Sequence, residues 1–250
     1  MPEGNTQAPK LAITVIGDTE IGRGMANALE AAGHSILAVS NAPTGLVQAD
    51  LVILALPDQL LTNAIEQITA ADAWRTGQLV AHTSGQHGYT LLAPAVACGV
   101  IPLAIHPAMS FADEPQDAVR IRESYFAISA PEIALPIAQA LVIEMGAEPL
   151  LIAEKDRATY FEAWSVANDF SGLVVNQAIG ILQQIGIRDP RGVIGPVVRA
   201  SVEKALDDGH RKLDPQDASL PESGSSETRS PDSRLPDSRF TDPHTPESPF

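Results

Sequence analysis

Residues 11–33 read LAITVIGDTEIGRGMANALEAAG, and this stretch decides the fold class. Leu11 to Ile16 is a short apolar run rich in β-branched residues, which is typical of a buried strand. Gly17 follows as a tight turn, and apolar residues then recur at helical spacing from Glu20 to Ala32. Gly33 stands where such a helix would end. The stretch therefore predicts a strand, a glycine turn and a helix in direct succession.

The alternation of strands and helices continues to residue 153. Further strands are predicted at 35–40, 51–56, 78–82, 100–105 and 149–152, and further helices at 59–73 and 131–145. Because these strands are apolar on both faces, they favour a parallel sheet that is covered by helices on both sides. We therefore predict an α/β, doubly wound parallel sheet over 11–153, after a flexible segment at 1–10.

The remainder of the chain has a different pattern. Residues 156–185 predict one long or broken helix and residues 191–206 a second, so a small all-helical domain is expected over 154–213. Residues 214–250 hold 7 prolines, 8 serines, 8 acidic residues and 3 basic residues. Such a composition buries too little apolar surface to offset the entropy lost on ordering. We predict a disordered tail there.

Charge and composition exclude several classes of protein. The 250 residues carry a net charge of −15, which repels nucleic-acid backbones. No apolar run approaches the roughly 20 residues that span a bilayer, and no signal-peptide core precedes the first strand. Cys98 is the only cysteine, and no cluster has the spacing of a metal site. We expect a cytoplasmic protein that binds no nucleic acid, membrane or metal.

The glycine turn approximates the dinucleotide-binding fingerprint G-x-G-x-x-G, in which glycines let a pyrophosphate approach a helix N-terminus. Gly17 and Gly22 occupy the first and third glycine positions, but Thr19 stands at the second. Asp18 and Glu20 add carboxylates, and one such contact at 4–5 Å costs about 3–4 kcal/mol at an effective dielectric near 20. The helix dipole returns only about 0.3–1 kcal/mol. Two interpretations stay open: a dinucleotide contacts Gly17, Thr19 and Gly22, or Asp18 or Thr19 simply caps the helix.

The adenosine half of such a site is incomplete. The second predicted strand ends at Ser40, where an acidic residue would select NAD and an arginine would accommodate NADP. Neither residue type is present, and only ten residues, 41–50, lead to the next strand. Ten residues are too few for the usual helix and additional strand. An adenosine bound there is expected to contact Ser40 but to lack part of its enclosing wall.

Two polar segments follow later strands. Residues 82–88 read HTSGQHG, and residues 105–111 read IHPAMSF. Ligands of open α/β sheets bind beyond the carboxyl ends of the strands, so these segments are expected to face one crevice. There His106 could act as a general acid or base with a pKa in the useful range, and Ser84 could hydrogen-bond a substrate oxygen. The alternative for each histidine is a structural hydrogen bond.

At these residues the chain resembles the bacterial Rossmann-like oxidoreductases with a helical C-terminal domain of unknown function, which belong to the 6-phosphogluconate dehydrogenase-like superfamily. The resemblance covers residues 11–213. It rests on HTSG at 82–85, LLAP at 91–94, PLAIHPAMSF at 102–111, ALPD at 55–58, and Arg157 with Tyr160. It implies NADP or NAD as cofactor, with the nicotinamide near Leu56, Pro57, Thr83 and Ser84. By similarity to prephenate dehydrogenase, it also implies catalytic roles for Ser84 and His106.

The chain departs from this family on the cofactor and substrate sides. Thr19 replaces a glycine, Glu20 replaces the usual arginine, and the segment after Ser40 is short. After residue 213, where the family continues with more helix, the acidic tail begins. The catalytic lysine of many relatives is absent from the stretch 160–168. There Asn168 could orient a substrate or form a capping or interhelical hydrogen bond, while Phe161 and Trp164 are expected in the core or an interface.

Two functions remain open. One is an NAD(P)-dependent oxidoreductase that acts on a small organic acid or imine between the two domains. The other is a degenerate relative that has lost dinucleotide binding and serves as a binding or assembly module. In either case a homodimer is expected, because residues 156–185 carry more apolar surface than a small helical domain can bury, and relatives commonly pair through this domain.

Overall fold

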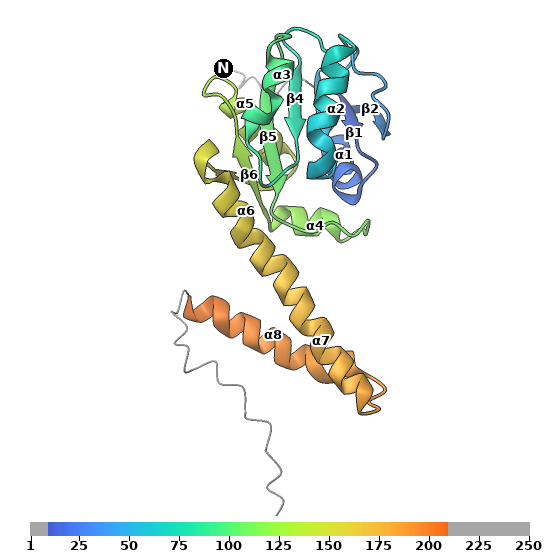
Figure 1. Ribbon diagram of the computed structural model, residues 1–250, viewed down its shortest axis with the longest axis vertical. Helices are drawn as coiled ribbons and strands as arrows, with labels where there is room; N and C mark the ends of the chain where they lie inside the picture. The colour runs from blue at the N-terminus through green and yellow to red at the C-terminus, as the bar shows by residue number, and fades with distance from the viewer. Residues whose placement is uncertain (1–9, 210–250) are drawn as a thin grey trace, which may run out of the picture. The chain divides into compact units, whose positions relative to one another are not determined.

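The computed structural model describes residues 10–209 of the chain. Residues up to Pro190 form one compact unit, and Arg191 begins a second. The first unit is built on a seven-stranded sheet with the order β2-β1-β3-β4-β5-β6-β7 (Figure 1). Its strands are β1 (Ala12–Ile16), β2 (Ser35–Ser40), β3 (Leu51–Leu54), β4 (Leu79–His82), β5 (Ile101–Pro107), β6 (Tyr125–Ser129) and β7 (Glu148–Leu151). The predicted α/β, doubly wound fold is confirmed.

The last two strands correct the prediction of a wholly parallel sheet. Neighbouring strands from β2 to β5 are parallel, but β6 is antiparallel to β5, and β7 is parallel to β6. β6 (YFAIS) is not predicted from the sequence, although β1 also has five residues. Two short helices, η1 (Tyr89–Leu92) and α4 (Asp117–Arg122), also lack a clear pattern in the sequence.

Both faces of the sheet are buried. In β3, Leu51 and Ile53 belong to one core cluster, whereas Val52 and Leu54 belong to a second. Successive side chains of a strand point to opposite faces, so this burial requires helices on both sides. The covering helices are α1 (Glu20–Ala31) and α5 (Leu135–Glu144) on one face, and α2 (Asp58–Ala70) and α3 (Ala93–Val96) on the other.

The strand order reverses at β1. The chain passes through α1 to β2 on one side of β1, and then returns to β3 on the other side. Residues 41–50 make this return without a helix or strand, as their number predicts. In open α/β sheets a ligand crevice lies at such a reversal, outside the carboxyl ends of the strands. The site is therefore expected where β1 and β3 end.

Between β7 and residue 209 the chain is mainly helical. η2 (Glu154–Asp156) leads into α6 (Arg157–Ser165), a π-helical turn (Val166–Phe170) and α7 (Ser171–Gln184), which together form the helix predicted at 156–185. α8 (Pro190–Asp208) corresponds to the helix predicted at 191–206. The change from α/β to helix lies near residue 153, whereas the compact units divide at Pro190. The domain limits 11–153 and 154–213 therefore stay a prediction.

Some expectations concern parts of the chain without a described structure. The flexible segment expected at 1–10, apart from Lys10, and the disordered tail expected at 214–250 lie outside the described residues. Within residues 10–209, no helix has both the length and the apolar character needed to cross a membrane. In the same part of the chain, no three acidic, histidine or cysteine side chains lie close enough together to hold a metal ion.

Candidate functional site

Gly17 and Gly22 shape the turn between β1 and α1. Gly17 has a φ of +119°, and a Cβ there would lie 2.1 Å from the carbonyl oxygen of Ala55, just beyond β3. A Cβ on Gly22 would lie 2.2 Å from the carbonyl oxygen of Gly17. Both positions need glycine because the turn packs directly against backbone, whatever ligand it holds.

Thr19 is the N-cap of α1. Its backbone is extended, with φ −108° and ψ 163°, so the conformation itself does not require glycine. Its hydroxyl donates to the carbonyl oxygen of Ala55 at 3.0 Å and accepts from the N–H of Gly22 at 3.1 Å. Thr19 rather than Asp18 therefore caps the helix, and it occupies one N–H that a phosphate could otherwise bind.

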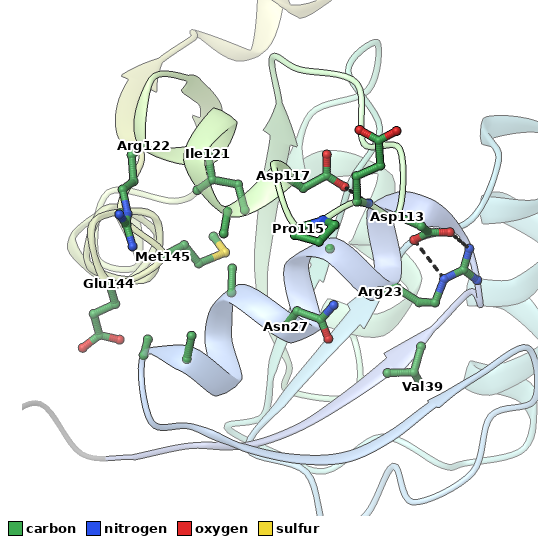
Figure 2. Close-up of a pocket in the computed structure, with 17 residues that line it drawn as sticks. Arg23, Asn27, Val39, Asp113, Pro115, Asp117, Ile121, Arg122, Glu144 and Met145 are labelled. Atoms are coloured by element: carbon green, nitrogen blue, oxygen red, sulfur yellow. Dashed lines mark hydrogen bonds and ion pairs between the residues drawn. The ribbon is translucent and has the colours of Figure 1, made fainter.

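Arg23 changes the charge balance that the sequence suggests. It lies in the first turn of α1, and its guanidinium pairs with the carboxylate of Asp18 and, as Figure 2 shows, with that of Asp113. The hydrogen bond from Arg23 holds the pKa of Asp113 below its usual value. The repulsion expected from Asp18 is thus partly neutralised. Asp18, Glu20 and Asp113 nevertheless still outnumber the one cation among them.

The turn keeps two donors that a phosphate could use. The backbone N–H groups of Glu20 and Ile21, at the N-terminus of α1, donate to no acceptor within the described part of the chain. Free N–H groups at such a helix end are the usual partners of a phosphate. The excess of carboxylates around them lowers the affinity that they could give an anion. The residues present therefore offer a dinucleotide phosphate two donors but attract it weakly.

A cavity of about 280 Å³ lies beyond the ends of β3, β4 and β5 and is bounded by α6. Six predicted site residues line it: Thr19, Leu56, Pro57, Thr83, Ser84 and His106. The other lining residues are Ile21, Ala55, Asp58, Gly85, Phe161 and Trp164. The structure therefore brings together the segments after three strands, as the crevice argument predicts.

His106 lies on β5 and is buried against α6. Its Nδ1 is 2.9 Å from the hydroxyl oxygen of Tyr160. Its ring makes edge-to-face contacts with three aromatic rings of α6. The centroid distances are 5.7 Å to Tyr160, 5.8 Å to Phe161 and 5.2 Å to Trp164. Burial, and next the charge of Arg157, lower the pKa of His106 to about 3. The prediction of a pKa in the useful range is therefore wrong, because aromatic side chains exclude water from the imidazole.

Nε2 of the neutral His106 ring lies beside Gly85. Gly85 and His106 both line the cavity, and a Cβ on Gly85 would lie 2.9 Å from Nε2. A neutral imidazole has one N–H. When Tyr160 donates its O–H to Nδ1, that N–H is at Nε2, and His106 can donate a hydrogen bond to a ligand.

Arg157 fixes the loop that carries Ser84. Its side chain is buried, and its guanidinium donates to the carbonyl oxygens of Ser84 at 2.8 Å, Ala127 at 3.0 Å and His87 at 3.1 Å. The loop that begins after β4 is thereby tied both to β6 and to the start of α6. Arg157 is a positioning residue, since it acts through backbone atoms of the cavity wall.

His82 also fixes the loop that carries Ser84. Its Nε2 donates to the carbonyl oxygen of Gly88 at 2.9 Å, and its Nδ1 accepts from the N–H of Ser84 at 3.2 Å. Burial lowers the pKa of His82 to about 4, so the ring is neutral. The hydroxyl of Ser84 accepts from the N–H of His87 at 3.1 Å. Its own proton remains available for a ligand in the cavity.

Asn168 and Ser40 lie outside the cavity. Asn168 is exposed in the π-helical turn, where its amide accepts from the hydroxyl of Ser110 at 3.1 Å and donates to Asp169 at 2.8 Å. This arrangement corresponds to the hydrogen-bonding alternative for Asn168. The hydroxyl of Ser40 accepts from the N–H of Ala42 at 3.0 Å. The functional roles expected for both residues stay predictions.

The structure adds site residues that the sequence did not single out. Phe161 and Trp164, expected in the core or an interface, line the cavity. In the sequence, only the family resemblance pointed to Arg157 and Tyr160. Asp58 also lines the cavity, and its place directly after Leu56 and Pro57 is the signal that could have found it.

A larger cavity of about 750 Å³ lies between α1, α4 and the end of α5 (Figure 2). None of the predicted site residues lines it. Arg23 is paired with Asp113 there, and the carboxylate of Asp117 accepts from the backbone N–H groups of Ala112 and Glu114. Because none of the residues predicted for the site lies there, we place the functional site at the smaller cavity.

Solved structures with this fold include two reductases and a protein assigned as an NADP oxidoreductase. A protein from Bacteroides fragilis, provisionally assigned as an NADP oxidoreductase, is 19% identical with a TM-score of 0.65, and 85% of each chain is covered. The 1-pyrroline-5-carboxylate reductase of Streptococcus pyogenes is 16% identical with a TM-score of 0.59, covering 83% of each chain. An imine reductase of Streptomyces aurantiacus is 18% identical with a TM-score of 0.59, covering 79% of this chain and 75% of the other. Identities this low establish the fold alone.

Two family profiles match parts of the chain. No curated protein matches the chain. The profile of a Rossmann-like domain matches residues 41–107, and that of a domain of unknown function, DUF2520, matches residues 124–213. The two matches follow each other in the order predicted for the Rossmann-like and helical domains. The chain therefore carries a Rossmann-like region followed by a DUF2520 region.

Proposed function

We propose that the chain is an NAD(P)-dependent oxidoreductase that acts on a small molecule in the 280 Å³ cavity. The observation that carries this proposal is the convergence of Leu56, Pro57, Thr83, Ser84 and His106 on that cavity. These are the residues that the family resemblance assigns to the nicotinamide and the reaction. The fold similarity to reductases and an NADP oxidoreductase supports the general class.

The proposed cofactor lies along the ends of β1 and β3. The N–H groups of Glu20 and Ile21 would hold a phosphate, and Leu56, Pro57 and Thr83 would form the wall beside the nicotinamide. When bound, the nicotinamide supplies or accepts the hydride. The small cavity volume leaves space for a substrate of only a few heavy atoms beside it.

The neutral imidazole of His106 orients the substrate. Its Nε2–H donates a hydrogen bond to an oxygen or nitrogen atom next to the reacting carbon, while the hydroxyl of Tyr160 keeps the proton off Nδ1. The hydroxyl of Ser84 offers a second donor. Arg157 keeps the Ser84 loop in position through three carbonyl oxygens. Polarisation by fixed donors is a sufficient role for these groups, since none of them needs to ionise.

A second candidate function is a binding or assembly protein that has lost its dinucleotide. The cap formed by Thr19 and the excess of carboxylates around the turn favour it. A titration with NADPH and NADH, followed by calorimetry, separates the two functions. The oxidoreductase proposal expects binding of at least one cofactor below millimolar concentration, and absence of binding at millimolar cofactor would leave only the second candidate.

A double substitution, Thr19→Gly with Glu20→Arg, is expected to tighten NADPH binding by at least tenfold. It frees the N–H of Gly22 and replaces one negative charge by a positive one beside the phosphates. The matched control is Glu30→Arg at the other end of α1, which makes the same charge change away from the turn. Equal effects of the two changes would mean that only net charge matters.

Substitution of His106 by alanine is expected to lower turnover by about 100-fold while cofactor affinity stays nearly unchanged. His106→Gln keeps an N–H donor and should retain more activity. Because the pKa of His106 is about 3, the rate should show no histidine inflection between pH 5 and 8. A wild-type inflection near pH 6.5 that disappears in His106→Ala would contradict the neutral donor role.

We also propose a homodimer that forms through the helical region. Large apolar side chains stand exposed along α7 and the preceding π-helical turn, namely Phe170, Leu173, Val174, Ile181 and Ile185. Exposed apolar surface of this extent is typical of an interface. Light scattering at tens of micromolar should give twice the chain mass, and Leu173→Glu should shift the mass toward one chain. A monomer mass for the unmodified chain would count against the proposal.

A further inference from the structure

The charges that line the cavity are unusual for a site that takes an organic acid. Of the twelve lining residues, Asp58 carries the only formal charge, and neither lysine nor arginine lines the space. No hydrogen bond or ion pair engages the Asp58 carboxylate within the described part of the chain. An unpaired carboxylate in a small cavity repels anions and attracts cations.

Two aromatic side chains reinforce this preference. Phe161 and Trp164 are stacked, with ring centroids 5.7 Å apart and an interplanar angle of 13°, and both line the cavity. The faces of aromatic rings carry negative electrostatic potential and attract cations, tryptophan most strongly. Each ring covers one face of the other, so the cavity combines one carboxylate with the remaining aromatic surface of Phe161 and Trp164.

Arg157 is the nearest positive group, and its charge acts on His106, but it does not line the cavity. Its guanidinium donates to three carbonyl oxygens. The nearby carboxylate of Glu154 also favours its charged form and raises its pKa, against the larger lowering by burial. His82 and His106 are neutral because burial lowers their pKa values to about 4 and about 3. No cation therefore remains in the cavity wall to pair with a substrate carboxylate.

We infer, resting on the proposed function, that the cavity takes a small organic cation, an iminium ion or a protonated amine, in preference to a carboxylic acid. Asp58 and Trp164 are the residues that determine this choice. An iminium ion also suits a site without a strong acid. Hydride addition to its carbon moves the C=N π pair onto nitrogen, so NAD(P)H is oxidised and a neutral amine forms without a proton transfer.

Binding of unreactive probes to the full chain tests the inference without requiring turnover. N-methylpyrrolidinium, cyclopentanone and cyclopentanecarboxylate offer the same ring size with positive, zero and negative charge. Ligand-observed NMR or calorimetry should give an affinity for the cation at least tenfold higher than for the carboxylate. Asp58→Asn should weaken the cation about tenfold and leave cyclopentanone unchanged. Glu66→Gln, on the exposed side of the same helix, is the matched control and should have no effect.

Equal or tighter binding of the carboxylate, or the same loss in Asp58→Asn and Glu66→Gln, would overturn the inference. Trp164→Leu supplies a second variant, with an expected loss of about threefold or more for the cation alone. The two proposals can fail separately. If the cavity prefers cations but the chain binds no NAD(P)H, the oxidoreductase proposal is wrong and the inferred cation preference stands. If the chain binds NAD(P)H but the cavity prefers the carboxylate, the oxidoreductase proposal stands and the inferred cation preference is wrong.

Discussion

A Gly17→Ala chain is expected to lose about 3 kcal/mol or more of its free energy of unfolding. Gly17 has a φ of +119°, which costs an L-residue about 1–2 kcal/mol even in open space. The new Cβ would also lie 2.1 Å from the carbonyl oxygen of Ala55, a backbone atom held by the sheet. Relief of this overlap requires β1 and β3 to separate. Urea unfolding followed by circular dichroism measures the loss.

Gly33→Ala is the matched control for this change. Gly33 also has a positive φ, +92°, but its nearest neighbours are atoms of the flexible Lys10 side chain at 3.2 Å. We expect a loss of about 1–2 kcal/mol from the backbone conformation alone. Equal losses in the two variants would show that the Ala55 overlap contributes nothing. Because Ala55 and Thr19 line the cavity, Gly17→Ala should also abolish ligand binding, whereas Gly33→Ala should not.

An Arg157→Met chain is expected to lose about 3–5 kcal/mol. The substitution fills similar volume but leaves the carbonyl oxygens of Ser84, His87 and Ala127 without their donor in a buried setting. Each unsatisfied acceptor costs about 1–3 kcal/mol, partly offset because the buried charge no longer has to be desolvated. Thermal and urea unfolding measure the net effect, and binding of a cavity ligand reports whether the Ser84 loop has moved.

Arg157→Lys separates charge from geometry. A lysine keeps the positive charge but has a single donor group, which cannot reach three carbonyl oxygens in the planar arrangement of a guanidinium. Its stability should lie between those of the unmodified chain and Arg157→Met. If Arg157→Met were as stable as the unmodified chain, the three hydrogen bonds of Arg157 would not outweigh the cost of desolvating its charge. Ligand binding alone would then show whether Arg157 positions the Ser84 loop.

Much of the fold is predictable because it depends on local patterns. The run 11–16, the glycine turn and the helical spacing of 20–32 are sufficient for β1, α1 and the turn between them, since periodicity and backbone conformation involve only near neighbours. The number of residues at 41–50 likewise predicts the short connection between β2 and β3. Local periodicity misses β6, although β1 has the same length. It also cannot foresee that β6 runs antiparallel to β5, because strand direction depends on pairing between residues far apart in the chain.

The site was only half predictable. Residues after strands meet at one edge of a parallel sheet, so Leu56, Thr83, Ser84 and His106 could be grouped from their positions alone. Asn168 follows no such rule, because it lies on a helix whose placement depends on packing. The pairing of Arg23 with Asp113 is another tertiary detail, because the two residues are 90 positions apart. Arg23 lies only five residues from Asp18, and the omission of this local pairing made the repulsion at the turn look larger than it is.

The chemical state of the site was decided by tertiary structure alone. By itself, the amino-acid sequence determined the class of fold, the turn that needs Gly17 and the residue types at the ends of the strands. It did not determine that His106 is neutral, since the ring of Tyr160 that meets it comes from 54 residues further along the chain. Burial by such distant side chains sets the local dielectric, and the dielectric sets both the pKa of a histidine and the charge that a cavity prefers.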